Sequence, residues 1–208
     1  MRLNLNILFI FFLSIFLITG SIYSVCAEEE KVRAKIGIQI KSGDRIVRAK
    51  SNDRLKKGDL LRIYLHPEEA SHVYIVHTDL KNVTFLNEDQ QKIQSSTLMM
   101  PSPRDYYEVD GESSTETITI IVSPNEVPEL LKKLEQQNKS YAGWLEYENI
   151  LIEKGKIDLS TSTVKPFPMA GNVRGLPGAS DIDPFMKELQ IFSGKSILVK
   201  KYEFKVKK

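Results

Sequence analysis

Histidine is the residue type in this chain that most directly suggests metal chemistry, because two or three converging imidazoles hold a transition metal. The chain has three, His66, His72 and His77. His72 and His77 are five residues apart, so on a single strand they point to opposite faces of the sheet. No metal site is therefore expected, and the histidines are interpreted as surface or sheet-edge residues.

Carboxylates could serve as the acid and base of a hydrolase. They gather at Glu68-Glu69 and from Asp105 to Asp110. A glycosidase holds two carboxyl groups roughly 5 to 10 Å apart in a cleft, and the sequence shows no such pairing. Acidic residues beside turns are usually solvated, so we expect no catalytic pair here.

Two further motifs resemble catalytic or phosphate-binding sequences only superficially. The serines of Gly111-Glu112-Ser113-Ser114 lack the Gly-x-Ser-x-Gly turn that presents a hydrolase nucleophile, and a polar hairpin tip is favoured. The segment from Gly171 to Gly178 matches neither a Walker loop nor a dinucleotide-binding turn. We expect no catalytic residue and no cofactor in this chain.

The Gly- and Pro-rich segment from Lys165 to Pro184 is the predicted partner-binding site. Its apolar residues follow no helical or strand period, and structureless loops of such length are usually functional or disordered. Arg174 could pair with a carboxylate or phosphate. The candidate binding residues are Phe167, Met169, Arg174 and Leu176. The alternative is that these side chains cover a sheet edge and complete the core.

The first residues have the pattern of an export signal. Arg2 is followed by an apolar run from Ile7 to Ile18, and Val25 and Ala27 fit a cleavage site before Glu28. The run is about a dozen residues, whereas a spanning helix needs about 20, so no stable membrane span is expected after cleavage. A retained anchor and a lipid on Cys26 remain the alternatives. The predicted location is the periplasm or the outside of the cell.

Composition limits the classes of protein that this chain can be. The formal net charge is +2 over 208 residues, which argues against a dedicated nucleic-acid binder. Cleavage before Glu28 would remove Cys26, the single cysteine, so no disulfide is expected. Residues 28–208 are enough to bury the core of a single domain.

The mature chain begins and ends with strongly alternating segments. Val32 to Lys41 places Val32, Ala34 and alternate isoleucines on one face, and Ile197 to Val206 turns Tyr202, Phe204 and Val206 inward. Glu116 to Ser123 alternates in the same way. The lysines at the C-terminus (Lys200, Lys201, Lys205, Lys207 and Lys208) are interpreted as the solvated face of an edge strand.

Three shorter runs are apolar on both faces and predict central strands covered on both sides. They are Leu60 to Leu65, Val73 to Val76 and Val83 to Leu86. Turns at Ser42-Gly43-Asp44, Lys57-Gly58-Asp59 and Asp110-Gly111 separate short strands at the spacing of a sandwich or barrel. We therefore predict a mainly β fold with an antiparallel β-sandwich core.

After Ser123 the apolar period changes to that of helices. Residues 127–154 predict a helical hairpin with Pro128 in the first turn of its first helix, and Gly155 is predicted to stop the second helix in a left-handed conformation. Asp183-Pro184 predicts the start of a further short helix. These helices are expected to pack on the sandwich, forming with it a single domain over residues 28–208 after a signal peptide at residues 1–27.

The segment from about Leu55 to Val127 resembles a bacterial family known as domain of unknown function 4384. The likeness rests on Leu55-Lys56-Lys57-Gly58-Asp59, Val73-Tyr74-Ile75-Val76, Val83-Thr84-Phe85-Leu86-Asn87, Ile93, Leu98, Pro101, Gly111 and Glu116 to Ser123. The chain departs from the family pattern at Leu86 and at Ser71-His72. The resemblance implies a small β-sandwich of the cell envelope with no agreed activity.

The expected function is that of an exported, non-enzymatic accessory or binding module of the cell envelope. Its expected partner is another envelope protein, and no nucleic acid is expected to bind. A cell-wall or polymer hydrolase and a structural subunit of an envelope complex are the alternatives. The hydrolase would need a cleft with paired carboxylates, whereas a binding module would need an exposed surface with apolar and polar side chains.

Overall fold

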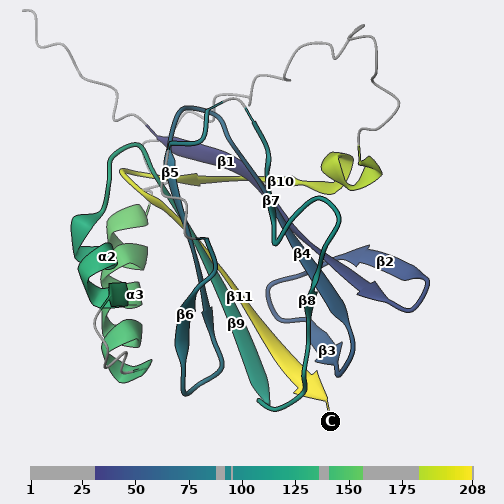
Figure 1. Cartoon of the computed structure of the whole chain (residues 1–208). Coiled ribbons are helices and arrows are strands. Elements are labelled where there is room, and N and C mark those ends of the chain that lie inside the picture. Colours follow the sequence, from purple (N-terminus) through teal and green to yellow (C-terminus); the bar gives the residue numbers. More distant parts are fainter. Residues whose placement is uncertain (1–30, 88–91, 95, 136–140, 157–182, 208) are drawn as a thin grey trace, which may run out of the picture. The chain divides into compact units, whose positions relative to one another are not determined.

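Two β-sheets face each other in this computed structural model, which describes residues 31–87, 92–94, 96–135, 141–156 and 183–207 (Figure 1). Residues 31–208 form one compact unit. The first sheet, sheet A, has the order β10 (Gln190–Gly194), β1 (Val32–Ser42), β4 (Leu60–Pro67), β7 (Leu98–Met100), with β2 (Arg45–Arg48) also on β1 and β8 (Tyr107–Glu108) on β4. The second, sheet B, has the order β3 (Arg54–Lys56), β11 (Leu198–Lys207), β9 (Thr115–Ser123), β5 (His72–Thr78), β6 (Val83–Phe85).

The main core lies between the two sheets. Strand β1 contributes its even-numbered apolar residues, as the alternation predicts, and Ile36 and Ile38 have no exposed surface. From sheet B, Ile120 and Phe204 are fully buried in the same cluster. The prediction of a mainly β sandwich is confirmed. One pairing departs from the expected antiparallel pattern, because β3 runs parallel to β11.

The helical hairpin covers the outer face of sheet B, beside β5, β6, β9 and β11 (Figure 1). Helix α2 (Pro128–Glu135) begins at the predicted proline, and α3 (Tyr141–Gly155) turns Trp144, Tyr147 and Leu151 onto the sheet. These side chains form a second apolar cluster with Tyr74 and Ile121, which point away from the main core. Sheet B is therefore packed on both faces.

Two of the strand predictions are corrected by the sheet order. Residues 83–86 were predicted to form a central strand, but β6 is the edge of sheet B. Its two apolar faces have another cause, because Phe85 packs under the helices whereas Leu86 packs against the main core. Conversely, β11 was interpreted as an edge strand, yet it lies between β9 and β3.

The lysines of β11 are also not one solvated face. Lys200 follows the inward row and its Nζ donates to Ser51 Oγ at 2.8 Å, while burial lowers its pKa. Lys201 points to the other face, where its Nζ donates to Glu148 of α3 at 2.7 Å. Only Lys205 and Lys207, near the C-terminus, are exposed.

Gly155 is needed for a reason other than the one predicted. Its φ is not positive, so it does not stop α3 in a left-handed conformation. A Cβ at this position would lie 2.7 Å from the backbone oxygen of Ile197, which precedes β11. The glycine therefore allows the end of α3 to approach the start of β11 closely.

Candidate binding surface on sheet A

The outer face of sheet A contrasts with that of sheet B, because no long helix packs on it among the described residues. The odd-numbered residues of β1 point to this face, opposite the buried isoleucines. They are Arg33, Lys35, Gly37, Gln39 and Lys41, a row without an acidic side chain. The alternation that buries one face of β1 therefore places its cations on the other.

Strand pairing brings further basic and polar side chains beside this row. On β4, His66 is paired with Lys35, Tyr64 with Gly37 and Arg62 with Gln39. On the other side of β1, Arg48 of β2 is also paired with Gln39. The outer face of sheet A is thus rich in basic side chains along both β1 and β4.

Two exposed isoleucines lie on the same face, each paired with a lysine. Ile46 of β2 is paired with Lys41 and is 52% exposed, and Ile191 of β10 is paired with Lys35 and is 47% exposed. They are two of the four large hydrophobic side chains that are exposed in the described part of the chain; the others are Leu80 and Ile150. These two lysine–isoleucine pairs, Lys35 with Ile191 and Lys41 with Ile46, give this face both charge and exposed apolar surface.

Arg62 is buried in the middle of this face. Its Nε donates to the backbone oxygen of Asp105 at 2.9 Å, and its guanidinium carbon lies 3.8 Å from the centre of the Tyr106 ring. Its Nη1 donates to Tyr64 Oη at 3.3 Å and lies 3.8 Å from Asp183 Oδ2. Arg62 thus holds the loop after β7 and the segment before β10 on the same sheet face.

Tyr64 is the partner of Arg62 and has no exposed surface. Its hydroxyl donates to Asp183 Oδ2 at 2.5 Å and lies 3.4 Å from Gln39 Oε1. Burial and the hydrogen bond to the Asp183 carboxylate raise the pKa of Tyr64 to about 12, although the nearby Arg62 opposes the shift. The phenol is consequently protonated throughout the neutral range.

A short 3₁₀ helix, η3 (Pro184–Glu188), is fixed on this face by these polar contacts and by apolar ones. Asp183 caps η3 through a bond from the Phe185 amide, and the Phe185 ring lies 4.8 Å from that of Tyr64. A Cβ on Gly37 would lie 2.7 Å from Leu189 Cδ2. Gly37 therefore makes room for the residues that lead from η3 into β10.

The cations of this face differ in how their charge is matched. Arg33 pairs with Glu68 at 3.3 Å, and Asp183 lies near Arg62. Arg48, in contrast, donates to the neutral backbone oxygen of Glu188 at 3.0 Å, and Lys41 Nζ lies 5.8 Å from the centre of the Tyr106 ring. These last two contacts orient the cations without neutralising them.

The pKa of His66 is affected by the positive charge of the same surface. Its pKa is lowered by burial and, secondly, by the charge of Lys35. Its Nδ1 lies 3.2 Å from Thr97 Oγ1. The imidazole is therefore a neutral polar group beside Lys35 at neutral pH.

The three histidines lie apart in the structure. His66 is on sheet A, whereas His72 and His77 are on β5, with side chains on its opposite faces. His77 Nε2 lies 2.5 Å from Glu116 Oε2 at one end of the sandwich. Within the described ranges no group of three or more histidine, cysteine or acidic residues could hold a metal ion.

Two of the acidic residues considered for a catalytic pair each have a partner of their own. Glu68 pairs with Arg33, and Asp105 accepts a bond from Ser102 Oγ at 2.6 Å. Among the acidic residues that the structure describes, Glu148 of α3 is the most buried, with 1% of its surface exposed, and it lies between the helix and sheet B. It accepts hydrogen bonds from Thr119 and Lys201 of sheet B and so fixes α3 to the sheet.

The predicted partner-binding residues Phe167, Met169, Arg174 and Leu176 lie outside the described residues, as do the predicted signal peptide and Cys26. That site remains a prediction. The contact among Arg62, Tyr64 and Asp183 was not predicted from the sequence. A usable signal was the polar pair Arg62 and Tyr64 on one face of an otherwise apolar run, which implies buried partners for both.

Comparison with protein-family models, curated proteins and solved structures finds no match to this chain. The resemblance to domain of unknown function 4384 therefore remains a prediction. Among the residues that the structure describes, no helix is long and apolar enough to cross a membrane.

Proposed function

We propose that this chain is an exported, non-enzymatic binding module of the cell envelope, which meets its partner through the outer face of sheet A. The observation that carries the proposal is the difference between the two outer faces. The helical hairpin covers that of sheet B, whereas that of sheet A presents Lys35, Lys41, Ile46 and Ile191. A surface that combines charge with exposed apolar side chains suits recognition.

The surroundings of the acidic groups favour binding over hydrolysis. A glycosidase needs one carboxyl group that donates a proton and a second one within about 10 Å, both open to substrate. Glu148 is buried against Lys201, Glu68 pairs with Arg33, and Asp183 accepts a hydrogen bond from Tyr64. Each of these three carboxylates binds a side chain of the fold instead of facing an open cleft as a free pair.

Site-specific photo-cross-linking in intact cells tests this function. A photoreactive residue in place of Ile191 should form a discrete adduct with an envelope component, because this position lies on the proposed surface. The matched control is Ile150, which is similarly exposed on α3, 56% against 47%. Equal adducts from both positions, or none from Ile191, would contradict the assignment of the surface.

A further inference from the structure

We propose that the outer face of sheet A docks on the anionic headgroups of a phospholipid membrane, through its lysine–isoleucine pairs and the cation of η3. This inference rests on the proposed function and names the partner of that same surface. The surface is defined by Lys35, Lys41, Ile46, Lys187 and Ile191.

The first observation is the arrangement of charge and apolar surface. Lys35 and Ile191 are direct cross-strand neighbours, as are Lys41 and Ile46. A cation beside an exposed aliphatic side chain matches the membrane interface, where the ammonium group meets phosphates and the aliphatic group enters the acyl boundary. Each pair alone would bind weakly, so binding requires both to act together.

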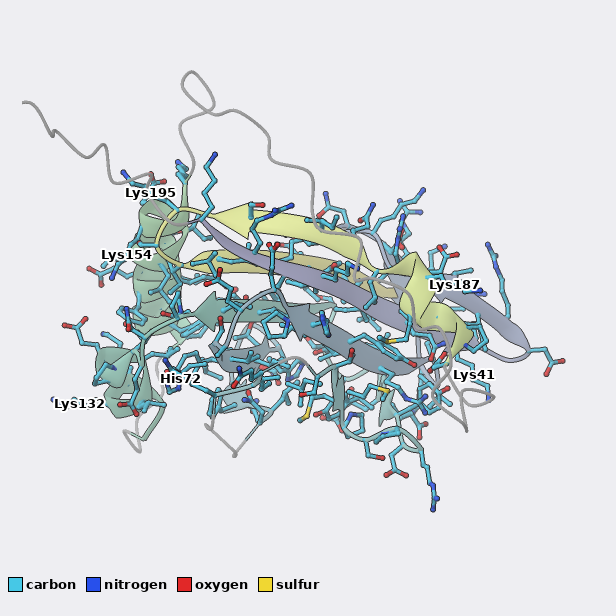
Figure 2. All side chains as sticks on the ribbon, turned by 90° about the horizontal axis from the view of Figure 1, so that it is seen from above. Lys41, His72, Lys132, Lys154, Lys187 and Lys195 are labelled. Atoms are coloured by element: carbon cyan, nitrogen blue, oxygen red, sulfur yellow. The ribbon has the colours of Figure 1, made fainter. Side chains whose placement is uncertain are left out.

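The second observation is the spacing of the two pairs. Lys35 and Lys41 are six residues apart on β1, which corresponds to about 20 Å along the strand. Exposed Lys187 of η3 lies at the same end of the unit as Lys41 (Figure 2). The next two residues lie on β1 and β2, because the Glu188 backbone oxygen accepts a bond from Arg48 and Leu189 lies over Gly37. The cations therefore extend along the length of the sheet instead of converging on one point, as they would for a single small anion.

The third observation favours a lipid surface over a rigid protein partner. Helix η3 packs on this face through Phe185, whose ring contacts that of Tyr64, and Asp183 accepts a bond from the Tyr64 hydroxyl. A folded partner would need a surface that fits around η3 and also matches the separate cations. A fluid headgroup layer adapts to such a shape, so the arrangement favours lipid.

Vesicle co-sedimentation tests the proposal with the exported protein, purified from cells that make the full chain. Vesicles of phosphatidylglycerol mixed with phosphatidylcholine should bind the protein at low salt, and vesicles of phosphatidylcholine alone should not. Binding should weaken severalfold as salt rises toward 1 M, because the screening length falls from about 10 Å at 0.1 M to about 3 Å. Failure to bind anionic vesicles at low salt would overturn the proposal.

Matched variants locate the surface. Lys41→Glu with Lys187→Glu should weaken binding at least about tenfold, since two cations are reversed. The control is Lys132→Glu with Lys154→Glu, which makes the same charge change on the helical hairpin, at the opposite end of the unit from Lys41 and Lys187 (Figure 2). Equal loss in both variants would mean that only net charge matters, and it would overturn the proposed surface.

The apolar part has its own pair of variants. Ile46→Ser with Ile191→Ser should reduce vesicle binding, whereas Leu80→Ser with Ile150→Ser, which removes the other two exposed hydrophobics, should not. Unchanged melting temperatures exclude misfolding as the cause of any loss. Unchanged binding by the Ile46 and Ile191 variant would overturn the role of the isoleucines.

Soluble polyphosphate separates the membrane from a free polyanion. If polyphosphate binds and anionic vesicles do not, the membrane assignment is wrong, although the surface still binds anions. If neither binds but Ile191 cross-links to an envelope protein in cells, the lipid inference fails and the proposed function stands. If anionic vesicles bind through this surface but Ile191 forms no cross-link in cells, the surface binds lipid in vitro and the proposed function in the envelope fails.

Discussion

Tyr64 shows how one side chain connects the sandwich to the residues that shape its outer face. Its ring is buried on sheet A beside Phe185, while its hydroxyl contacts Asp183 and lies near Gln39 and Arg62. Arg62 and Gln39 are themselves only 6% and 4% exposed. Water therefore cannot readily replace their bonds to the Tyr64 hydroxyl if that hydroxyl is removed. A change at Tyr64 should therefore loosen η3 as well as the local core.

Tyr64→Phe tests this role. It should lower the free energy of unfolding by about 1 to 2 kcal/mol, because the Asp183 carboxylate and the Gln39 amide lose a hydrogen-bonding partner. Chemical denaturation measures this loss. Since the shape of the ring is kept, an unchanged stability would mean that the hydroxyl bonds contribute nothing.

The same residue predicts an effect of alkaline pH. The fold raises the pKa of Tyr64 from 10.0 to about 12, and burial raises that of Tyr202 to about 12 also. A raised folded-state pKa stabilises the protonated phenol, so this stability is complete below pH 10 and is lost as the pH rises through about 12. The ultraviolet absorbance of phenolate should show fewer groups titrating near pH 12 in Tyr64→Phe, and a curve identical to that of the wild type would refute the shift.

Gly155→Ala is a second test at a single residue. Alanine usually favours a helix over glycine by about 1 kcal/mol, but here its Cβ would lie 2.7 Å from the Ile197 oxygen. We expect a loss of about 1 to 3 kcal/mol, typical of overpacking against a fixed backbone. A rise in melting temperature would show that the close approach relaxes at no cost.

Among the elements, α3 and η3 have corresponding roles on the two outer faces of the sandwich. Each is attached through a carboxylate, Glu148 in α3 and Asp183 at the start of η3, which bonds to a side chain of the sheet beneath. The difference lies in the apolar contact. Helix α3 buries Trp144, Tyr147 and Leu151 on its sheet, whereas η3 buries only Phe185. The outer face of sheet A therefore keeps exposed basic and isoleucine side chains beside η3.

Glu148→Gln tests the attachment of α3. The amide keeps the shape but loses the charge opposite Lys201, and we expect a loss of about 1 to 3 kcal/mol in the free energy of unfolding. Lys201 is partly exposed and can turn toward water, which keeps the cost below that of a fully buried pair. Glu146→Gln, on the exposed side of the same helix, is the control and should change stability by less than about 0.5 kcal/mol. Similar losses in both variants would rule out a specific role for the pair.

At the scale of the whole molecule, the last strand is the one that joins the parts of sheet B. Strand β11 pairs with β9 along eight residues and with β3 near its end. Tyr202, Phe204 and Val206 extend from it into the core between the sheets. The chain therefore completes its second sheet only with its C-terminal residues.

Deleting residues 197–208 should abolish cooperative unfolding. The deletion removes a central strand and two buried aromatic rings, Tyr202 and Phe204. Each ring contributes roughly 1.5 to 3 kcal/mol, in a domain whose net stability is about 5 to 15 kcal/mol. Thermal melting followed by circular dichroism measures the effect. The control replaces the exposed Lys205 and Lys207 by Gln and should melt as the wild type does; a cooperative transition in the truncated protein would contradict the assignment of β11 to the core.

Export is also a property of the whole molecule. We expect the mature protein to begin at Glu28 and to fractionate as soluble periplasmic material, because Val25 and Ala27 form a cleavage site after a short apolar run. Intact mass measurement of the native protein decides this. A retained N-terminal segment, or the mass of a diacylglycerol on Cys26, would be incompatible with cleavage before Glu28.

The sequence by itself determined the elements that depend on local periodicity. Alternation identified β1, β9 and β11 and their buried faces, and Pro128 marked the start of α2. A strand or helix with one apolar face records that face in its own residues, so no distant contact is needed to recognise it.

Only the tertiary structure decided which strands are neighbours and which polar groups meet. The order of sheet B made β6 the edge and β11 internal, against the sequence-based expectation. Asp183 reaches Tyr64 across 119 residues, and Lys201 reaches Glu148 across 53. Such contacts arise because buried polar groups need partners wherever the chain brings them, and sequence spacing does not record that requirement.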